Sequence, residues 1–175
     1  MTERIRNIKL IVLDVDGTLT DGGVYIDSNG VETKKFNIKD GGGIALAIRA
    51  GYEFMILTGR RSYCVERRAQ ELKVKYLFQG VENKIEVLDS FMREHSLLPE
   101  NVAYMGDDFN DLDCMKLVGF VACPADAMQC VKDSANFVAE HNGGFGAVRD
   151  FCEFILKQQR KSTSRSQTVE YINEA

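Results

Sequence analysis

The sequence lacks the features that mark several large classes of protein. It has no excess of positive charge, because 22 lysines and arginines stand against 26 aspartates and glutamates, for a net charge of −4. This balance argues against nucleic acid as a partner. Near the start, the longest apolar run is Leu10 to Leu13, which is too short for a signal peptide or a membrane span. We therefore expect a cytoplasmic protein that binds neither nucleic acid nor a membrane.

Common metal and nucleotide motifs are also missing. The five cysteines include no CxxC pair, so they fit neither a zinc site nor a disulfide framework, and we expect them to be reduced and mostly buried. Neither of the two histidines is placed for a zinc site. The chain has no GxxxxGK(S/T), no GxGxxG follows a strand, and Leu19 stands where an EF-hand loop begun at Asp14 needs glycine.

What remains is the composition of a globular domain, with 175 residues, 45% of them hydrophobic and 27% charged. Apolar segments of strand length alternate with segments of helical period, which predicts a three-layer α/β/α Rossmann-like sandwich with a central, mainly parallel sheet. We expect strands at 8–13, 52–57, 76–78, 102–105, 120–122 and 137–139. We expect helices at about 43–50, 65–72, 85–95 and 108–118, a short one near 127, and a last one from 147 to about 156.

Two further segments stand outside this alternation. The β-prone pieces 24–26 and 31–36 flank Asp27-Ser28-Asn29-Gly30, a turn-forming cluster that predicts a β-hairpin. The stretch 157–175 is polar with few apolar anchors. We therefore expect a single domain over 1–156, followed by a tail that is flexible or docks on a neighbouring subunit.

The chemistry-bearing residues follow the predicted strands. Ligands of open α/β sheets bind beyond the carboxyl ends of the strands, where this chain carries Asp14 and Asp16, then Thr58, then Lys84, then three acids at 107, 108 and 111. Acids that hold Mg²⁺, with hydroxyl and ammonium groups for phosphoryl oxygens, suit phosphoryl transfer through a carboxylate nucleophile.

Each feature alone also has a purely structural interpretation. The DxDGT segment could be a turn with an Asx cap, and the acids at 107, 108 and 111 could cap a helix. Lys84 could be a solvated lysine, and the arginines at 60, 61, 67 and 68 could only balance nearby acids.

The motifs taken together carry a family resemblance. DVDGT (14–18), ILTGR (56–60), Lys84 and GDDFND (106–111) resemble, in order, the four motifs of the haloacid dehalogenase superfamily of phosphatases. Over most of its length the chain is similar to the 3-deoxy-D-manno-octulosonate 8-phosphate (KDO 8-phosphate) phosphatase family. The segments that carry this likeness are KKFNIKDGGGI, LTGRRSYCVERRA, YLFQGVENK, ENVAYMGDDFND and GGFGAVRD.

The resemblance implies a Mg²⁺-dependent phosphatase that converts KDO 8-phosphate to KDO and phosphate through an aspartyl-phosphate, in lipopolysaccharide biosynthesis. Related nonulosonate phosphates, such as KDN 9-phosphate or N-acetylneuraminate 9-phosphate, are alternative substrates. A non-catalytic regulatory or interaction domain with the same fold is a further alternative.

The resemblance also assigns roles to residues. It makes Asp14 the nucleophile and Asp16 the general acid and base, with Thr58 and Lys84 on the phosphoryl oxygens. Mg²⁺ would be held by Asp14, the backbone carbonyl of Asp16 and Asp107, supported by Asp108 and Asp111. The expected substrate-binding residues are the loop Asn37, Ile38, Lys39, Asp40 and Gly41, together with Gly59, Arg60 and Arg68. Ala45, Phe145 and the tail from Lys157 depart from the family pattern.

The motif spacing leaves no room for an inserted cap domain. Between Asp14 and Thr58 the hairpin, one helix and one strand use up the residues, and between Thr58 and Lys84 only a helix and a strand fit. Members of the resembled family are tetramers in which neighbouring hairpins and C-terminal tails complete each site. We therefore expect a homotetramer that uses the hairpin at 24–36 and the tail after 156.

Overall fold

The computed structural model describes the backbone of residues 5–166 and the side chains of residues 5–158. Its centre is a sheet of six strands in the order β5-β4-β1-β6-β7-β8, with every neighbouring pair parallel. The strands are β1 (Leu10–Leu13), β4 (Glu53–Thr58), β5 (Tyr76–Gln79), β6 (Val102–Met105), β7 (Phe120–Cys123) and β8 (Phe137–Val138). The predicted parallel sheet is confirmed.

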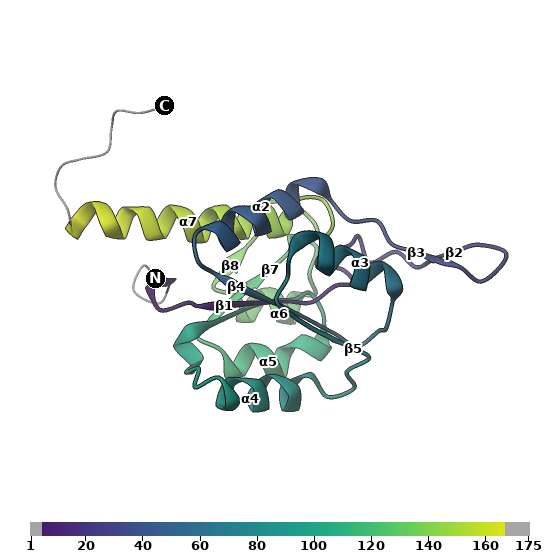
Figure 1. Cartoon of the computed structure of the whole chain (residues 1–175), viewed down its shortest axis with the longest axis horizontal. Helices are drawn as coiled ribbons and strands as arrows, with labels where there is room; N and C mark the ends of the chain where they lie inside the picture. Colours follow the sequence, from purple (N-terminus) through teal and green to yellow (C-terminus); the bar gives the residue numbers. More distant parts are fainter. Residues whose placement is uncertain (1–4, 167–175) are drawn as a thin grey trace.

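Helices cover both faces of the sheet (Figure 1). On one face lie α2 (Ile38–Arg49), α3 (Tyr63–Leu72) and α7 (Ala147–Ser166), and on the other lie α4 (Lys84–Glu94), α5 (Leu112–Leu117) and α6 (Gln129–Ser134). Two short 3-10 helices, η1 (Pro99–Asn101) and η2 (Phe109–Asp111), flank β6. The chain is therefore the three-layer α/β/α sandwich that its alternating pattern predicted.

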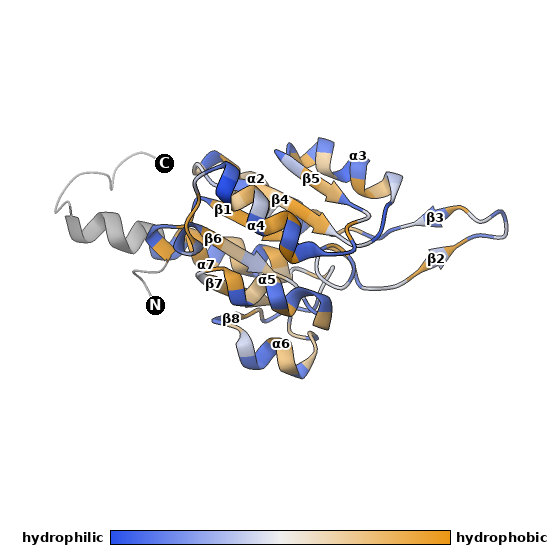
Figure 2. Ribbon diagram, turned by 90° about the horizontal axis from the view of Figure 1, so that it is seen from below, coloured by the Kyte–Doolittle hydropathy of each residue, from blue (hydrophilic) through white to orange (hydrophobic). Residues whose placement is uncertain are grey.

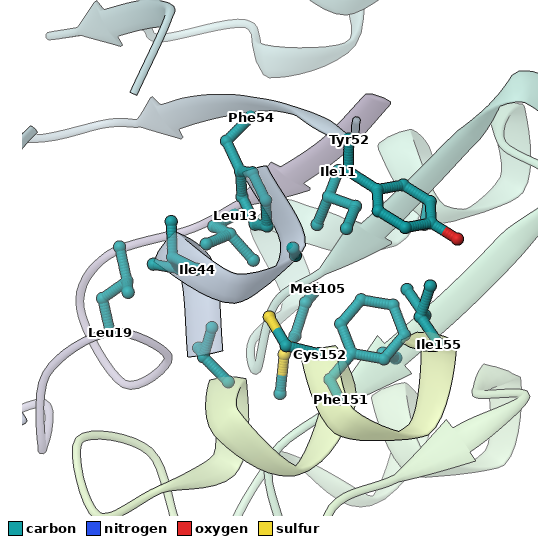
Figure 3. Packing of buried hydrophobic residues seen from close by; sticks show 14 of the residues in the cluster. Ile11, Leu13, Leu19, Ile44, Tyr52, Phe54, Met105, Phe151, Cys152 and Ile155 are labelled. Atoms are coloured by element: carbon teal, nitrogen blue, oxygen red, sulfur yellow. The ribbon is translucent and has the colours of Figure 1, made fainter. Parts of the chain in front are cut away.

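The central strand β1 shows why this sequence requires two helical layers. Ile11 and Leu13 point into the core beneath α2 and α7, whereas Leu10 and Val12 point into the core beneath α4 and α5. Figure 3 shows Ile11 and Leu13 packed with residues of α2 and α7 in the first of these cores. Because all four side chains are essentially inaccessible to water, each stabilises the fold by roughly 1.5–3 kcal/mol.

A hairpin projects from the body of the molecule, as Figure 2 shows from below. Its strands β2 (Tyr25–Ile26) and β3 (Glu32–Thr33) are antiparallel and shorter than predicted. The Asp27 carboxylate accepts hydrogen bonds from the backbone N–H groups of Asn29 and Val31, which fixes the turn. Val24, Ile26 and Val31 remain exposed.

No cap domain interrupts the described part of the chain. Between β1 and β4 stand only the hairpin and α2, and between β4 and α4 only α3 and β5. In these two segments the hairpin is thus the only addition to the alternation of strands and helices, as the motif spacing predicted.

Two helices are longer than predicted. Helix α2 begins at Ile38 and not near 43, because Asn37 caps it by accepting a hydrogen bond from the Lys39 N–H. The glycines at 41–43 are poor helix formers, but here they allow close packing: a Cβ on Gly43 would lie 3.0 Å from Cα of Arg149 in α7. Helix α7 runs to Ser166 and not to about Leu156, since Lys, Gln and Arg after Leu156 favour helix even without apolar anchors.

Smaller differences concern element ends. Strand β1 starts at Leu10, and the predicted helix 108–118 is divided into η2 and α5. Helix α6 starts at Gln129, after a turn that contains Ala127. All five cysteines are free, with three buried and Cys64 and Cys130 half-buried, as predicted. The predicted role of the tail falls partly on 167–175, which lie outside the described residues.

Candidate active site

The carboxyl ends of three adjacent strands, and the loop after a fourth, place the predicted residues together. Asp14 directly follows β1, Thr58 ends β4, Lys84 begins α4 after β5, and Asp107 follows β6. Because β4, β1 and β6 are neighbours in the sheet, side chains from sequence positions far apart meet at one edge.

Lys84 is the centre of a buried ion network. Its Nζ donates to Asp14 Oδ1 at 2.7 Å and to Asp111 Oδ1 at 2.8 Å. The Tyr104 hydroxyl, from β6, donates to the same Asp111 oxygen at 2.6 Å. Lys84 is 4% exposed, Asp14 5% and Asp111 0%, so these charges interact without the screening that water gives surface pairs. The structural interpretation of Lys84 as a solvated lysine is therefore wrong.

Asp107 stands beside this network. The Thr18 hydroxyl donates to its Oδ1 at 2.8 Å, and its own backbone N–H donates to Asp111 Oδ2 at 3.0 Å. The DxDGT glycine makes room for it: Gly17 has φ +89°, and a Cβ there would lie 2.0 Å from Asp107 Oδ2. Glycine is thus required at position 17 both by its backbone conformation and by the approach of Asp107.

The buried acids have strongly altered proton affinities. Burial and the neighbouring Asp111 carboxylate raise the pKa of Asp14 to about 7, against the opposing effect of Lys84. Burial raises the pKa of Asp107 to about 7, although the Thr18 hydroxyl favours its charged form. Burial alone would lower the pKa of Lys84, but Asp14 and Asp111 hold it above its usual value. The cluster therefore has more negative charge than one lysine can neutralise.

The residues present fit a divalent cation. Carboxylate oxygens of Asp14, Asp107 and Asp111 all lie within 4.8 Å of one another. A set of carboxylate oxygens without histidine or cysteine suits Mg²⁺ and not zinc. The predicted ligand set named Asp14, Asp16 and Asp107, with Asp111 in support. The Asp111 carboxylate lies within this group, while the Asp108 carboxylate accepts from the Phe109 N–H and begins η2. The predicted set, in which the Asp16 ligand is its backbone carbonyl, stays a prediction.

Asp16 faces the hairpin and lies outside this acidic cluster. Its Oδ1 forms an ion pair with Lys34, which follows β3, and its Oδ2 lies 3.8 Å from Nε of Arg60. Arg60 also donates to Glu32 Oε1 at 2.8 Å. The predicted acid and base residue is thus held by the hairpin.

The predicted substrate loop 37–41 is the cap and first turn of α2. Ile38 and Lys39 are exposed there, but Asp40 is 1% exposed and its Oδ1 accepts from the Arg149 N–H at 2.8 Å. Asp40 thus holds the start of α7, and its contact with substrate stays a prediction. Gly41 is buried beside the guanidinium of Arg68.

The two predicted arginines differ in their surroundings. Gly59 and Arg60 are exposed at the end of β4. Arg68 donates to the Asn37 carbonyl at 3.1 Å and to Glu71 at 2.8 Å, and its side chain is 15% exposed. The Arg60 side chain is thus half exposed while it bonds Glu32, whereas the Arg68 side chain is mostly enclosed by the protein. The contact of either residue with substrate stays a prediction.

Sequence reasoning missed three residues that shape the site, namely Thr18, Lys34 and Tyr104. Thr18 belongs to the DVDGT motif and Tyr104 to a predicted strand, but nothing in the sequence shows that Thr18 contacts Asp107 or that Tyr104 contacts Asp111. Lys34 lies at the end of a β-prone piece, with no pattern that distinguishes it from Lys35.

No helix among the described residues is long and apolar enough to cross a membrane.

The family model for haloacid dehalogenase-like hydrolase matches residues 77–151. The chain is 41% identical over 158 residues to the 3-deoxy-D-manno-octulosonate 8-phosphate phosphatase KdsC of Escherichia coli (strain K12), covering 90% of this chain and 84% of that protein.

Solved structures show the same likeness. A probable YrbI family phosphatase from Pseudomonas syringae is 42% identical, with a TM-score of 0.88, and the match covers 97% of this chain and 98% of that one. The 3-deoxy-D-manno-octulosonate 8-phosphate phosphatase from Moraxella catarrhalis, in complex with magnesium ion, phosphate ion and KDO, is 33% identical with a TM-score of 0.87. That match covers 95% of this chain and 97% of that one.

Proposed function

Because the chain belongs to the 3-deoxy-D-manno-octulosonate 8-phosphate phosphatase family of haloacid dehalogenase-like hydrolases, we propose that it hydrolyses KDO 8-phosphate to KDO and inorganic phosphate. The observation that carries this proposal is the buried Lys84, bonded to Asp14 and Asp111 beside Asp107 at the carboxyl ends of parallel strands. The proposed site thus combines a carboxylate nucleophile, a cation and a place for Mg²⁺.

In the first half of the proposed reaction, Asp14 is the nucleophile. Its carboxylate oxygen forms a bond to phosphorus while the bond from phosphorus to the sugar oxygen breaks, and Asp16 gives that oxygen its proton. Lys84 and Thr58 hold phosphoryl oxygens, because one is the buried cation at Asp14 and the other ends the adjacent strand β4.

In the second half, Asp16 takes a proton from a water molecule whose oxygen attacks the phosphorus. The bond from phosphorus to Asp14 then breaks, which releases inorganic phosphate and restores the carboxylate. Asp14, Asp107 and the backbone carbonyl of Asp16 would hold Mg²⁺, with Asp111 beside them in support, and the cation would stabilise negative charge on the phosphoryl oxygens. Tyr104 and the N–H of Asp107 keep Asp111 in place for this role.

The alternative functions, namely another substrate or a non-catalytic role, are less well supported. Related nonulosonate phosphates share the carboxylate and the phosphate ester, so substrate comparison must separate them from KDO 8-phosphate. A non-catalytic domain would not need Asp16 beside Asp14, and the presence of both acids favours turnover. The homotetramer, the cytoplasmic location and the place in lipopolysaccharide biosynthesis stay predictions from the family.

The test is phosphate release by the purified protein with Mg²⁺ from KDO 8-phosphate, KDN 9-phosphate, N-acetylneuraminate 9-phosphate and hexose phosphates. We expect the highest kcat/KM on KDO 8-phosphate. Asp14→Asn should abolish turnover, because the amide cannot form the acyl phosphate. Asp113→Asn is the matched control, since Asp113 is an exposed acid on α5 paired with Lys116. Turnover by Asp14→Asn at the rate of the control would contradict the mechanism.

A further inference from the structure

A buried lysine stands on an exposed hairpin. The side chain of Lys34 is 3% exposed, whereas that of its neighbour Lys35 is 47% exposed. An ammonium group withdrawn from water is tolerated only when it is paired and hydrogen-bonded. The charged groups paired with Lys34 therefore indicate the role of its buried ammonium group.

Lys34 and its partners form a group of four linked charges that we call the flap cluster: Asp16, Glu32, Lys34 and Arg60. Lys34 pairs with Asp16 Oδ1 and lies 3.6 Å from Glu32 Oε1. Arg60 bonds the same Glu32 oxygen at 2.8 Å and lies 3.8 Å from Asp16 Oδ2. Two cations and two carboxylates thus alternate, with Glu32 and Lys34 from the hairpin and Asp16 and Arg60 from loops at the sheet edge.

The two oxygens of Asp16 are held unequally. Oδ1 is paired with Lys34, whose side chain is buried, while Oδ2 lies 3.8 Å from Arg60, whose side chain is half exposed. The Asp16 side chain is 28% exposed and lies in the loop after β1, so without Lys34 its carboxylate would be free to rotate. With Lys34 in place, one oxygen is fixed, and the other is left with only the more distant Arg60 beside it.

We propose that Lys34 is a positioning residue for Asp16, which holds Oδ1 so that Oδ2 is the oxygen that exchanges the proton with the sugar oxygen. This inference deepens the proposed function and rests on it. It makes the hairpin part of the catalytic apparatus within one chain: an element outside the core sets the position of the proton donor.

The inference has a specific kinetic consequence. Asp16 matters for the departure of a sugar oxygen, which must be protonated, but not for p-nitrophenolate, which leaves without a proton. The parameter kcat/KM reports the steps up to that departure, so later hydrolysis of the aspartyl-phosphate does not enter it. Loss of Lys34 should therefore lower kcat/KM for alkyl phosphates selectively.

The experiment measures kcat/KM of wild type, Lys34→Met, Lys34→Gln and Lys34→Arg on KDO 8-phosphate, a hexose 6-phosphate and p-nitrophenyl phosphate. With Lys34→Met or Lys34→Gln we expect a loss of about 10- to 100-fold on both sugar phosphates, within what general acid catalysis contributes, and little change on p-nitrophenyl phosphate. Lys34→Arg should recover most of the loss. Lys35→Met, whose partner is Asp21, is the matched control and should behave as wild type.

Three results would overturn the inference. An equal loss on all three substrates would make Lys34 a structural anchor of the hairpin. A loss confined to KDO 8-phosphate would make it a contact for the sugar carboxylate. A full additional loss when Lys34→Met is combined with Asp16→Asn would show that it does not act through Asp16, since residues that act together are not additive.

The proposed function and this inference fail in different ways. If wild type prefers another phosphate to KDO 8-phosphate, the proposed substrate is wrong, but the comparison of hexose 6-phosphate with p-nitrophenyl phosphate still tests Lys34. Thermal melting of each variant identifies any that does not fold, and Lys34→Gln, which keeps a polar side chain of similar reach, then carries the test.

Discussion

The acidic cluster of Asp14, Asp107 and Asp111 should make the metal-free protein less stable as the pH rises from about 5 to 7. Burial raises the pKa of Asp14 and of Asp107 from 3.8 to about 7. In this window the unfolded chain has already released those protons, while the folded chain still binds them. The free energy of unfolding therefore falls as the pH rises, by at most about 1.4 kcal/mol per pH unit for each group.

The effect of Asp14 and Asp107 between about pH 5 and 7 can be separated from the titration of acids whose pKa is lowered. Asp21, Asp27, Glu32 and Glu53 have pKa values below their usual range because of their hydrogen bonds and ion pairs. Their contribution to stability is complete above about pH 5. For a chain of this length 1 kcal/mol shifts Tm by roughly 2–4 °C. The negative slope of Tm above pH 5 should thus report the acids whose pKa is raised by burial. These include Asp40 as well as Asp14 and Asp107, so only the difference between wild type and Asp107→Asn reports the cluster.

The assay is thermal melting of wild type, Asp107→Asn and the control Asp113→Asn at several pH values, in EDTA and in excess Mg²⁺. In EDTA, Tm of wild type should fall by up to about 3–6 °C per pH unit more than Tm of Asp107→Asn. Stabilisation by Mg²⁺ should grow with pH up to about 7, because the cation binds the deprotonated acids. Equal slopes in wild type and Asp107→Asn, or stabilisation by Mg²⁺ that does not change with pH, would refute this reasoning.

Four further outcomes follow from other parts of the molecule. Gly17→Ala should cost about 1–3 kcal/mol of stability and weaken activation by Mg²⁺, since its Cβ would lie 2.0 Å from Asp107 Oδ2. Chemical denaturation measures the loss of stability and a Mg²⁺ titration of activity measures the activation, and unchanged activation would contradict the prediction. Asp40→Ala should lower stability by about 0.5–2 kcal/mol, as expected for a lost helix cap, with KM unchanged. Arg60→Ala should lower kcat/KM for KDO 8-phosphate by about 10- to 100-fold and for a hexose phosphate much less, as expected for a lost bond to a carboxylate. Light scattering should give a tetramer that Ile26→Lys weakens and the equally exposed control Leu98→Lys does not; a fully active monomeric wild type would refute the assembly.

The convergence of the predicted catalytic residues could be foreseen because it depends on backbone order alone. A buried strand without alternation, such as Leu10–Leu13, has to be central in a parallel sheet, and parallel strands present their carboxyl ends at one edge. Asp14, Thr58, Lys84 and Asp107 follow such strands directly or after a short loop, so neither distances nor side-chain orientation were needed to group them.

What the sequence did not predict depends on contacts between distant elements. The glycines at 41–43 indicated a loop, because their low helix propensity is local, whereas the close approach of Arg68 and Arg149 that they allow is tertiary. Asp40 was predicted to contact substrate. The sequence could not show that it accepts a hydrogen bond from the N–H of Arg149, because the two residues are 109 positions apart. The pairing of Lys34 with Asp16 likewise depends on how the hairpin folds back over the loop after β1.

The charge of the site also implies an order of binding. Above about pH 7, the carboxylates of Asp14, Asp107 and Asp111 outnumber the ammonium of Lys84 by two negative charges. A phosphate monoester is itself a dianion at that pH, so it meets net repulsion until a divalent cation has neutralised the pocket. Binding should therefore be ordered, with Mg²⁺ first, and the apparent KM for the sugar phosphate should rise as free Mg²⁺ is lowered.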